Sequence, residues 1–130
     1  MRSRRVKRLL ETILVVEDHD DSRRMLVDLL MDAGFRVLSA ANGAEALRHL
    51  QHEPPDLMVL DLMLPWVNGV EVLATVRQMP ALEKIPVIVV TATNTSPFEL
   101  CAYNPLVVMH KPLDVDVIVP TVQQLLSSPL

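Results

Sequence analysis

The stretch Leu57-Met58-Val59-Leu60-Asp61 is a run of four apolar residues that ends in an aspartate. A short run that is apolar at every position is typical of a strand with helices on both faces, as in parallel sheets. Similar runs at residues 13–16, 35–40, 86–90 and 106–109 alternate with segments of helical period. The alternation predicts one α/β domain with five β-α units and a doubly wound parallel sheet. Polar residues within the run 35–40 indicate an edge strand.

The segments between these runs carry helix signals. Apolar residues recur at helical spacing over residues 25–33 and Gly34 then stops the helix, while Asn42 with Glu45 and Asn68 with Glu71 have the spacing of a capping box. These signals predict three helices. The last segment has one apolar stripe but contains Pro120, which removes a backbone donor, so we expect a kink or a late start there.

The composition is that of a folded domain. The chain has 130 residues, the length of one domain, with 50% hydrophobic residues and a formal net charge of -4. Its first eight residues hold a basic cluster, which we interpret as part of a solvated tail (residues 1–10) before a domain at residues 11–128. A nucleic-acid surface needs basic residues clustered on a folded face, so direct nucleic-acid binding is not expected.

Three further features favour the cytoplasm. No apolar run is long enough to cross a membrane. The apolar stretch after the basic start is broken by Glu11 and lacks the cleavage site of a signal peptide. Cys101 is the only cysteine, so it cannot form an internal disulfide. We therefore expect a cytoplasmic protein that does not bind a membrane.

Polar residues stand at the carboxyl ends of four predicted strands, where a doubly wound sheet forms its sites. They are Glu17 and Asp18 after the first strand, Asp61 after the third, Thr91 at the end of the fourth, and Lys111 after the fifth. Carboxylates at the end of a buried strand are costly unless a cation compensates them. A few oxygen ligands suit Mg²⁺, often together with a phosphate. Asp20 and Asp21, which come next in the chain, are expected to cap a helix instead.

Asp61 has two interpretations. Taken alone, it is equally well explained as a cap or ion-pair partner and as a nucleophile. A bare acidic cluster repels itself, so its combination with a lysine and a hydroxyl favours a functional site. A carboxylate can attack phosphorus to form an acyl phosphate when a metal and a fixed ammonium neutralise the transferring oxygens. Lys111 suits the ammonium role.

The fragments together resemble the receiver-domain signature of two-component response regulators. They are Ile13-Leu-Val-Val-Glu17-Asp18, Asp61-Leu-Met-Leu-Pro65 leading to Asn68-Gly69, Val-Val-Thr91-Ala92 and Lys111-Pro112, in this order, within residues 11–126. The resemblance implies a flavodoxin-like (βα)5 fold with strand order 2-1-3-4-5. It also implies a signalling phosphoacceptor, not an enzyme, which assists only its own phosphorylation and dephosphorylation.

The resemblance implies a role for each site residue. Asp61 would be the phosphoacceptor, and Thr91 and Lys111 would contact the phosphoryl oxygens. Glu17, Asp18, Asp61 and the backbone carbonyl of Met63 would surround Mg²⁺ or Mn²⁺. The bond between Lys111 and its proline would be cis, which X-Pro bonds allow at small cost. The implied partners are a sensor histidine kinase or histidine phosphotransfer protein and a downstream effector protein, with a homodimer left open.

Three features depart from the family pattern. Val108 occupies the place of an aromatic residue that usually rotates during signalling, and Tyr103 lies too far upstream to replace it directly. The segment between the fourth and fifth strands is short, and Ser96-Pro97 predicts a helix of at most two turns. Trp66 stands where a small or polar residue is usual. Packing on its own loop is the first interpretation, partner contact the second and shielding of an acyl phosphate a third.

Three hypotheses follow. The first is a phosphorylation switch at Asp61. The second is a phosphorylation-independent receiver-like interaction module, in which Asp61→Asn leaves partner binding unchanged. The third is a phosphohydrolase that uses an aspartyl phosphate; it expects a second aspartate where Met63 stands and is disfavoured. His49 and His52 have a spacing that could bind metal, but two imidazoles on a polar face are more often solvated, and we assign them no role.

Overall fold

The computed structural model describes residues 10–92, 100–103 and 106–127, and these form a five-stranded parallel sheet. The strands are β1 (Thr12–Val16), β2 (Arg36–Ala40), β3 (Leu57–Asp61), β4 (Val87–Thr91) and β5 (Leu106–His110). Every neighbouring pair is parallel, and the order is β2-β1-β3-β4-β5. The predicted fold class and strand order are therefore confirmed. The strand with polar residues, β2, is indeed at an edge.

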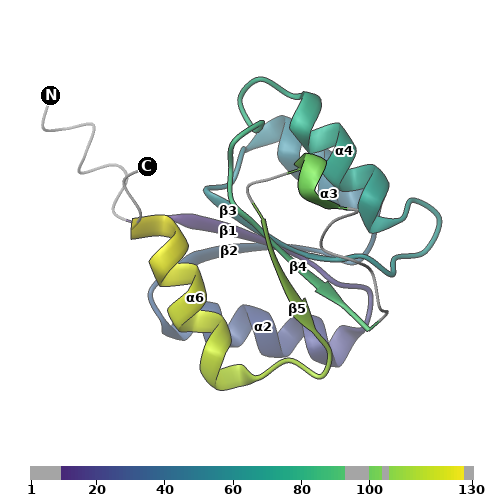
Figure 1. The fold of residues 1–130 in the computed structure, drawn as a ribbon. Coiled ribbons are helices and arrows are strands. Elements are labelled where there is room, and N and C mark those ends of the chain that lie inside the picture. Colours follow the sequence, from purple (N-terminus) through teal and green to yellow (C-terminus); the bar gives the residue numbers. More distant parts are fainter. Residues whose placement is uncertain (1–9, 93–99, 104–105, 128–130) are drawn as a thin grey trace, which may run out of the picture.

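Helices cover both faces of the sheet, as Figure 1 shows. Helices α2 (Asp20–Asp32) and α6 (Val115–Ser127) lie on one face, and α3 (Gly43–His52), α4 (Gly69–Gln78) and the short 3-10 turn η1 (Cys101–Tyr103) lie on the other. Successive strand residues contribute to opposite faces. Leu14 and Val16 belong to the apolar cluster under α3 and α4, whereas Ile13 and Val15 belong to the cluster under α2 and α6. Both faces of the strand are buried, which explains the unbroken apolar runs.

The starts of α3 and α4 and the end of α2 follow the predicted signals. Asn68 and Glu71 form a complete capping box, whereas Asn42 caps α3 while the Glu45 carboxylate accepts from the backbone N–H of Ala41 at 2.8 Å. Gly34 has φ +99°, the left-handed conformation expected after a helix.

The prediction that Asp20 or Asp21 caps the first helix is wrong. The N-cap is His19, whose ring nitrogen Nδ1 accepts from the backbone N–H of Ser22. The two aspartates instead lie in the first turn of α2, where negative charge still favours the positive end of the helix dipole.

Two further predictions concern the carboxyl-terminal third. Helix α6 begins at Val115 and runs through Pro120, so the predicted late start is wrong, and the alternative of a kink stays a prediction. Tyr103 and Val108 are both partly buried against the apolar cluster under α3 and α4, which agrees with a packing role for the tyrosine. The helix predicted at Ser96-Pro97 lies outside the described residues.

Gly69 allows α4 to begin directly against the end of β3. A Cβ atom at this position would lie 2.5 Å from Leu62 Cα and 2.6 Å from the Asp61 carbonyl oxygen, which are closer than real contacts allow. The Gly69 N–H donates to the Leu62 carbonyl at 3.0 Å. The absence of a side chain thus lets the first turn of α4 support the backbone on which Asp61 stands.

Candidate functional site

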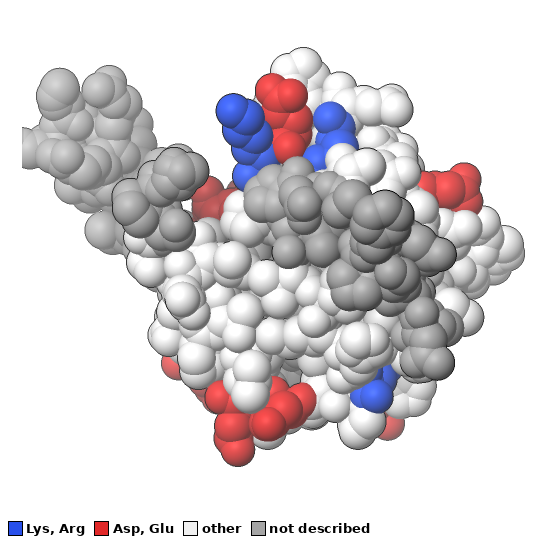
Figure 2. All heavy atoms as spheres, in the orientation of Figure 1, with Lys and Arg blue, Asp and Glu red and all other residues white. Residues whose placement is uncertain are grey.

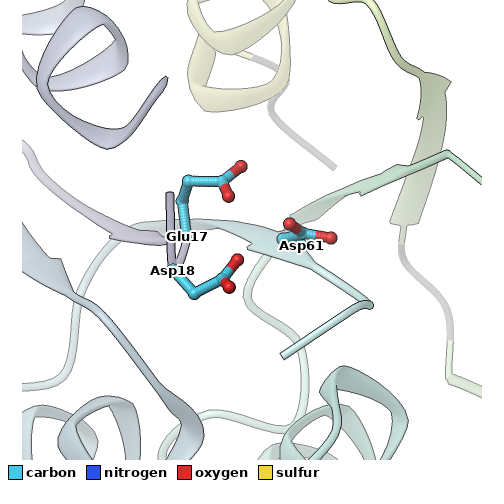
Figure 3. A group of neighbouring side chains, drawn as sticks. All are labelled: Glu17, Asp18 and Asp61. Atoms are coloured by element: carbon cyan, nitrogen blue, oxygen red, sulfur yellow. The ribbon is translucent and has the colours of Figure 1, made fainter. Parts of the chain in front are cut away.

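Three carboxylates meet at the carboxyl ends of β1 and β3. Glu17 and Asp18 follow β1, Asp61 is the last residue of β3, and one oxygen of each lies within 4.8 Å of the others. Figure 3 shows the three side chains directed into a common space at this edge of the sheet. Parallel strands place their carboxyl ends side by side, and this brings Asp61 together with residues 43 and 44 positions earlier in the chain.

Asp61 is held in one orientation by two hydrogen bonds. Its side chain is almost fully buried, with 2% relative exposure for the residue. Oxygen Oδ1 accepts from the Met63 backbone N–H at 2.8 Å, and Oδ2 accepts from Lys111 Nζ at 2.9 Å. The Leu62 N–H continues the ladder by donating to Val90 at 3.1 Å. The carboxylate therefore sits on a backbone that is fixed on both sides.

Glu17 is also buried and also bonded through both oxygens. Oε1 accepts from Lys111 Nζ at 3.0 Å, and Oε2 accepts from the His19 backbone N–H at 3.1 Å. Burial raises the pKa of Glu17 above its ordinary value, although the hydrogen bonds from His19 and Lys111 oppose the shift. Its charged form thus depends on nearby positive charge.

Lys111 joins the two buried carboxylates. Partial burial pulls the pKa of Lys111 down, but the hydrogen bonds to Asp61 and Glu17 outweigh burial, and the pKa is raised overall. Its backbone N–H donates to the carbonyl of Thr91, the buried last residue of β4, at 2.9 Å. The bond from Lys111 to Pro112 is cis, as the resemblance implied. The ammonium is consequently fixed beside Asp61 and close to the end of β4.

The donor set fits a divalent metal ion. Three carboxylates face one ammonium, so negative charge exceeds positive charge in the pocket. Asp18 is exposed, which leaves an open side for water ligands, and oxygen ligands with retained waters are what Mg²⁺ prefers. Met63 lies in the same loop, and its role as a carbonyl ligand stays a prediction. Across residues 10–92, 100–103 and 106–127, only this group brings three potential metal-ligating side chains together.

The two histidines of α3 make other contacts. His49 Nε2 lies 3.0 Å from the Ser39 carbonyl oxygen, and His52 Nδ1 lies 2.8 Å from the Arg48 carbonyl oxygen. Each ring therefore bonds to backbone.

Trp66 does not pack on its loop, so the first interpretation of this residue is wrong. It is 88% exposed and has φ +63°, a left-handed conformation that is unfavourable for a residue with a side chain. Met63 in the same loop is 58% exposed. The loop after β3 thus turns Met63 and Trp66 outward, whereas Leu62 is buried and Leu64 and Val67 pack against the apolar cluster under α3 and α4.

Sequence reasoning missed Arg23. Its guanidinium donates to the carbonyl oxygens of Glu17 and Asp18, at 2.9 and 3.4 Å. The available signal was Asp20 three residues earlier, which forms an ion pair with Arg23 at 2.6 Å and holds the side chain toward the start of the helix.

A cleft of about 570 Å³ adjoins the acidic site. Glu17 and Lys111 form its charged end, and Met25, Leu26 and Val115 are among the apolar residues of its walls. The face in Figure 2 carries scattered basic side chains; one group of acidic side chains lies at the lower edge, over the start of α6, and others lie at the top and at the right edge. Among the residues that the structure describes, this face offers no basic patch for nucleic acid. No helix in the described ranges is long and apolar enough to span a bilayer.

Comparison with known proteins gives the same family from sequence and from structure. A family model described as response regulator receiver domain matches residues 13–123. The chain is 39% identical over 85 residues to the transcriptional regulatory protein AfsQ1 of Streptomyces coelicolor. It is 42% identical over 84 residues to the phosphate regulon transcriptional regulatory protein PhoB of Rhizobium meliloti.

Each of these two matches covers 65% of this chain but only 36% and 37% of the relatives, so the chain matches little more than a third of their length. The crystal structure of the chemotaxis response regulator CheY4 of Vibrio cholerae superposes with a TM-score of 0.83 and 27% identity, over 89% of this chain and 98% of that one. The structural likeness therefore covers nearly the whole of the CheY4 chain and most of this one.

Proposed function

The chain belongs to the response regulator receiver domain family, and from this premise we propose that Asp61 accepts a phosphoryl group in a two-component signalling system. The donor is the phosphohistidine of a sensor histidine kinase or of a histidine phosphotransfer protein, or a small phosphodonor. Phosphorylation changes the contacts of the chain with a downstream effector protein. The proposal places this exchange in the cytoplasm.

One observation supports this proposal above the others. Lys111 Nζ lies 2.9 Å from Asp61 Oδ2 and 3.0 Å from Glu17 Oε1, so a fixed ammonium stands beside the proposed nucleophile. The raised pKa of Lys111 keeps that ammonium protonated at neutral pH. A phosphoryl group on Asp61 would bring negatively charged oxygens to this position, and a preorganised cation lowers the energy of that charge.

The proposed reaction is a displacement at phosphorus. An Asp61 oxygen attacks the phosphorus of phosphohistidine, the P–O bond forms as the P–N bond breaks, and the departing imidazole nitrogen keeps the electron pair and takes up a proton. Lys111 and the Thr91 hydroxyl contact the transferred phosphoryl oxygens. The Met63 N–H orients the attacking carboxylate.

Glu17, Asp18 and Asp61, with the Met63 carbonyl, would hold the Mg²⁺ or Mn²⁺ ion that receivers generally use. Such an ion supplies positive charge for the oxygens of the transferring group. The residues of the chain act only on its own aspartate, so the protein is a phosphoacceptor that assists its own phosphorylation and dephosphorylation, and it is not an enzyme for a separate substrate.

The test is the intact mass of the protein after incubation with MgCl₂ and acetyl phosphate. We expect the gain of one phosphoryl group, which is lost in Asp61→Asn and in samples with excess EDTA. Asp56→Asn is a matched control because Asp56 lies at the opposite end of β3, where it accepts from the Thr12 N–H at 2.8 Å. Asp56→Asn should retain the mass gain.

Absence of a mass gain with acetyl phosphate and with a panel of purified histidine kinases would contradict the proposal. In that case, partner binding that is the same for the parent chain and Asp61→Asn would support the phosphorylation-independent module. A mass gain that persists in Asp61→Asn would place the modification on another residue.

A further inference from the structure

Arg23 connects the first turn of α2 to the backbone that carries the acidic pair. Its Nη1 atom donates to the Glu17 carbonyl oxygen at 2.9 Å and lies 3.4 Å from the Asp18 carbonyl oxygen, while Nη2 donates to Asp20 Oδ1 at 2.6 Å. The Arg23 side chain is 21% exposed and that of Asp20 is 75% exposed. One guanidinium thus connects three consecutive parts of the chain, which are the end of β1, the turn after it and the start of α2.

The backbone at Glu17 and Asp18 needs such a partner. The paired register of β1 with both β2 and β3 ends at Val16. Beyond it, the Glu17 N–H still donates to the Ala40 carbonyl at 3.0 Å. Carbonyls that follow the last paired residue have no ladder donor, and an unpaired carbonyl near a buried site is costly. Arg23 supplies donors from a side chain whose planar fork has a fixed geometry.

We propose that Arg23 is a positioning residue for the divalent metal site: by binding the backbone carbonyls of Glu17 and Asp18, it orients their two carboxylates toward Asp61. The proposal rests on the proposed function, because it concerns the metal that phosphorylation requires. Arg23 contacts backbone oxygens and the Asp20 carboxylate, so the carboxylates of the acidic group remain available as ligands.

Two effects of Arg23 on metal binding have opposite signs. Orientation of the acidic pair raises the affinity for Mg²⁺, whereas a positive charge close to a cation site lowers it by repulsion. Substitutions separate these effects. Arg23→Lys keeps the charge but loses the fork, Arg23→Gln loses both, and Arg24→Gln removes an equal charge from the exposed neighbouring position, for which no contact with either carbonyl is found.

The experiment is a titration of the 130-residue chain with MgCl₂, followed by the amide NMR signals of residues 17–19 and by calorimetry. Thermal unfolding in EDTA measures the stability of each metal-free variant. We expect Arg23→Lys to bind Mg²⁺ about tenfold more weakly than the parent chain, as for loss of an outer partner of a metal ligand. Arg23→Gln should be at least as weak. Arg24→Gln should match the parent or bind slightly more tightly.

Asp20→Asn is a second test that disturbs folding less. It removes the carboxylate that steadies Arg23 but leaves the contacts with the two carbonyls, so its loss of affinity should be smaller than that of Arg23→Lys. We expect this graded loss of Mg²⁺ affinity while both variants keep unfolding temperatures in EDTA close to that of the parent chain. A merely structural role would instead lower the unfolding temperature and leave the affinity of the folded fraction unchanged.

Parent-like affinity in Arg23→Lys, or tighter binding in Arg23→Gln, would overturn the inference while leaving the proposed function intact. If Arg23→Gln unfolds, the order of Mg²⁺ affinities among the parent chain, Asp20→Asn and Arg23→Lys decides whether the inference holds. Failure of the parent chain itself to bind Mg²⁺ or Mn²⁺ would overturn the metal part of the proposed function, and this inference with it.

Discussion

Asp61, the last residue of β3, and Trp66, in the loop that follows, lie five residues apart and have opposite surroundings. Asp61 is 2% exposed, and both of its carboxylate oxygens accept hydrogen bonds. Trp66 is 88% exposed and stands on a left-handed backbone. A buried carboxylate keeps its charge only where hydrogen-bond donors or a cation surround it, whereas an exposed ring needs no such partners.

The comparison separates two parts of this segment. The first part, Asp61 and Leu62, is fixed by contacts with β4, with Lys111 after β5 and with α4, so its geometry follows from the fold. At Trp66 the backbone has an unfavourable conformation and the apolar ring is exposed, and neither feature stabilises the fold. This difference indicates that the first part serves the site, whereas neither the core nor the site explains the conformation of Trp66. The predictions below test each part in turn.

The largest effect is expected from Lys111→Met. This change removes the ammonium that joins Asp61 and Glu17 and leaves two buried carboxylates without their cation. We expect phosphorylation by acetyl phosphate to slow by about 100- to 1000-fold, the range seen when one preorganised partner of developing charge is lost. The measurement is the rate of mass gain under saturating MgCl₂.

Lys84→Met is the matched control, because Lys84 is exposed and lies in the loop before β4, at the opposite end of the sheet. It should phosphorylate at the parent rate. A rate for Lys111→Met within tenfold of the parent would show that the fixed ammonium is not what makes Asp61 reactive.

Asp18→Asn should have opposite effects with and without metal. Without metal, it relieves repulsion among three carboxylates, so the unfolding temperature in EDTA should rise. With metal, it removes a ligand, so the rise in unfolding temperature that MgCl₂ gives to the parent chain should disappear. Asp21→Asn, an equal charge change in the first turn of α2, should leave the MgCl₂-dependent rise in place. Equal responses of the two variants to MgCl₂ would argue against a metal role for Asp18.

Gly69→Ala tests the support beneath Asp61. The added methyl group would lie 2.5 Å from Leu62 Cα and 2.6 Å from the Asp61 carbonyl oxygen, and backbone must move to relieve it. We expect a loss of about 2 kcal/mol in the free energy of unfolding, as for overpacking of a dense core, together with slower phosphorylation. Urea unfolding and the mass assay measure the two effects.

Gly34→Ala is the contrasting variant. Nothing lies within 4 Å of the added Cβ, so its cost comes only from φ +99° and amounts to about 1 kcal/mol. Because Gly34 is remote from the acidic pocket, phosphorylation should not change. Slower phosphorylation in both glycine variants would mean that stability, and not the position of Asp61, limits the reaction.

The sequence was sufficient to predict the sheet and the placement of the acidic residues. Strands buried on both faces leave unbroken apolar runs, and the carboxyl ends of parallel strands necessarily meet at one edge, so the meeting of Glu17, Asp18 and Asp61 follows from topology. Lys111 was predictable for the same reason. The order β2-β1-β3-β4-β5 came from family resemblance, since periodicity alone does not fix which strands are neighbours.

The errors concern residues whose environment depends on side-chain geometry. The backbone angles decide which residue caps a helix, and a shift of one residue changes the cap. His19 is the N-cap of α2, in place of Asp20 or Asp21. Arg23 was missed because its two partners at the site are backbone carbonyls, which leave no trace in the pattern of side chains; only its ion pair with Asp20 gave a signal. For Trp66, the large apolar ring favoured packing, but the left-handed backbone turns it into solvent.

The smallest effect is expected at Trp66, where two substitutions isolate the backbone cost. At φ +63°, alanine keeps the strain of a Cβ atom, whereas glycine does not. Trp66→Gly should therefore be more stable than Trp66→Ala by about 1 kcal/mol in urea unfolding. Both variants should gain a phosphoryl group from acetyl phosphate at the parent rate, because the hydrogen bonds that hold Asp61 come from Met63 and Lys111 and not from the exposed ring. Slower phosphorylation in both variants would mean that the ring lies over the site during the reaction. Equal stability of the two variants would mean that the loop in solution does not hold residue 66 in the left-handed conformation. If both variants are phosphorylated at the parent rate and differ in stability as expected, neither the fold nor the chemistry of Asp61 requires the strained backbone at Trp66. That result would favour a role of Trp66 in contact with a partner.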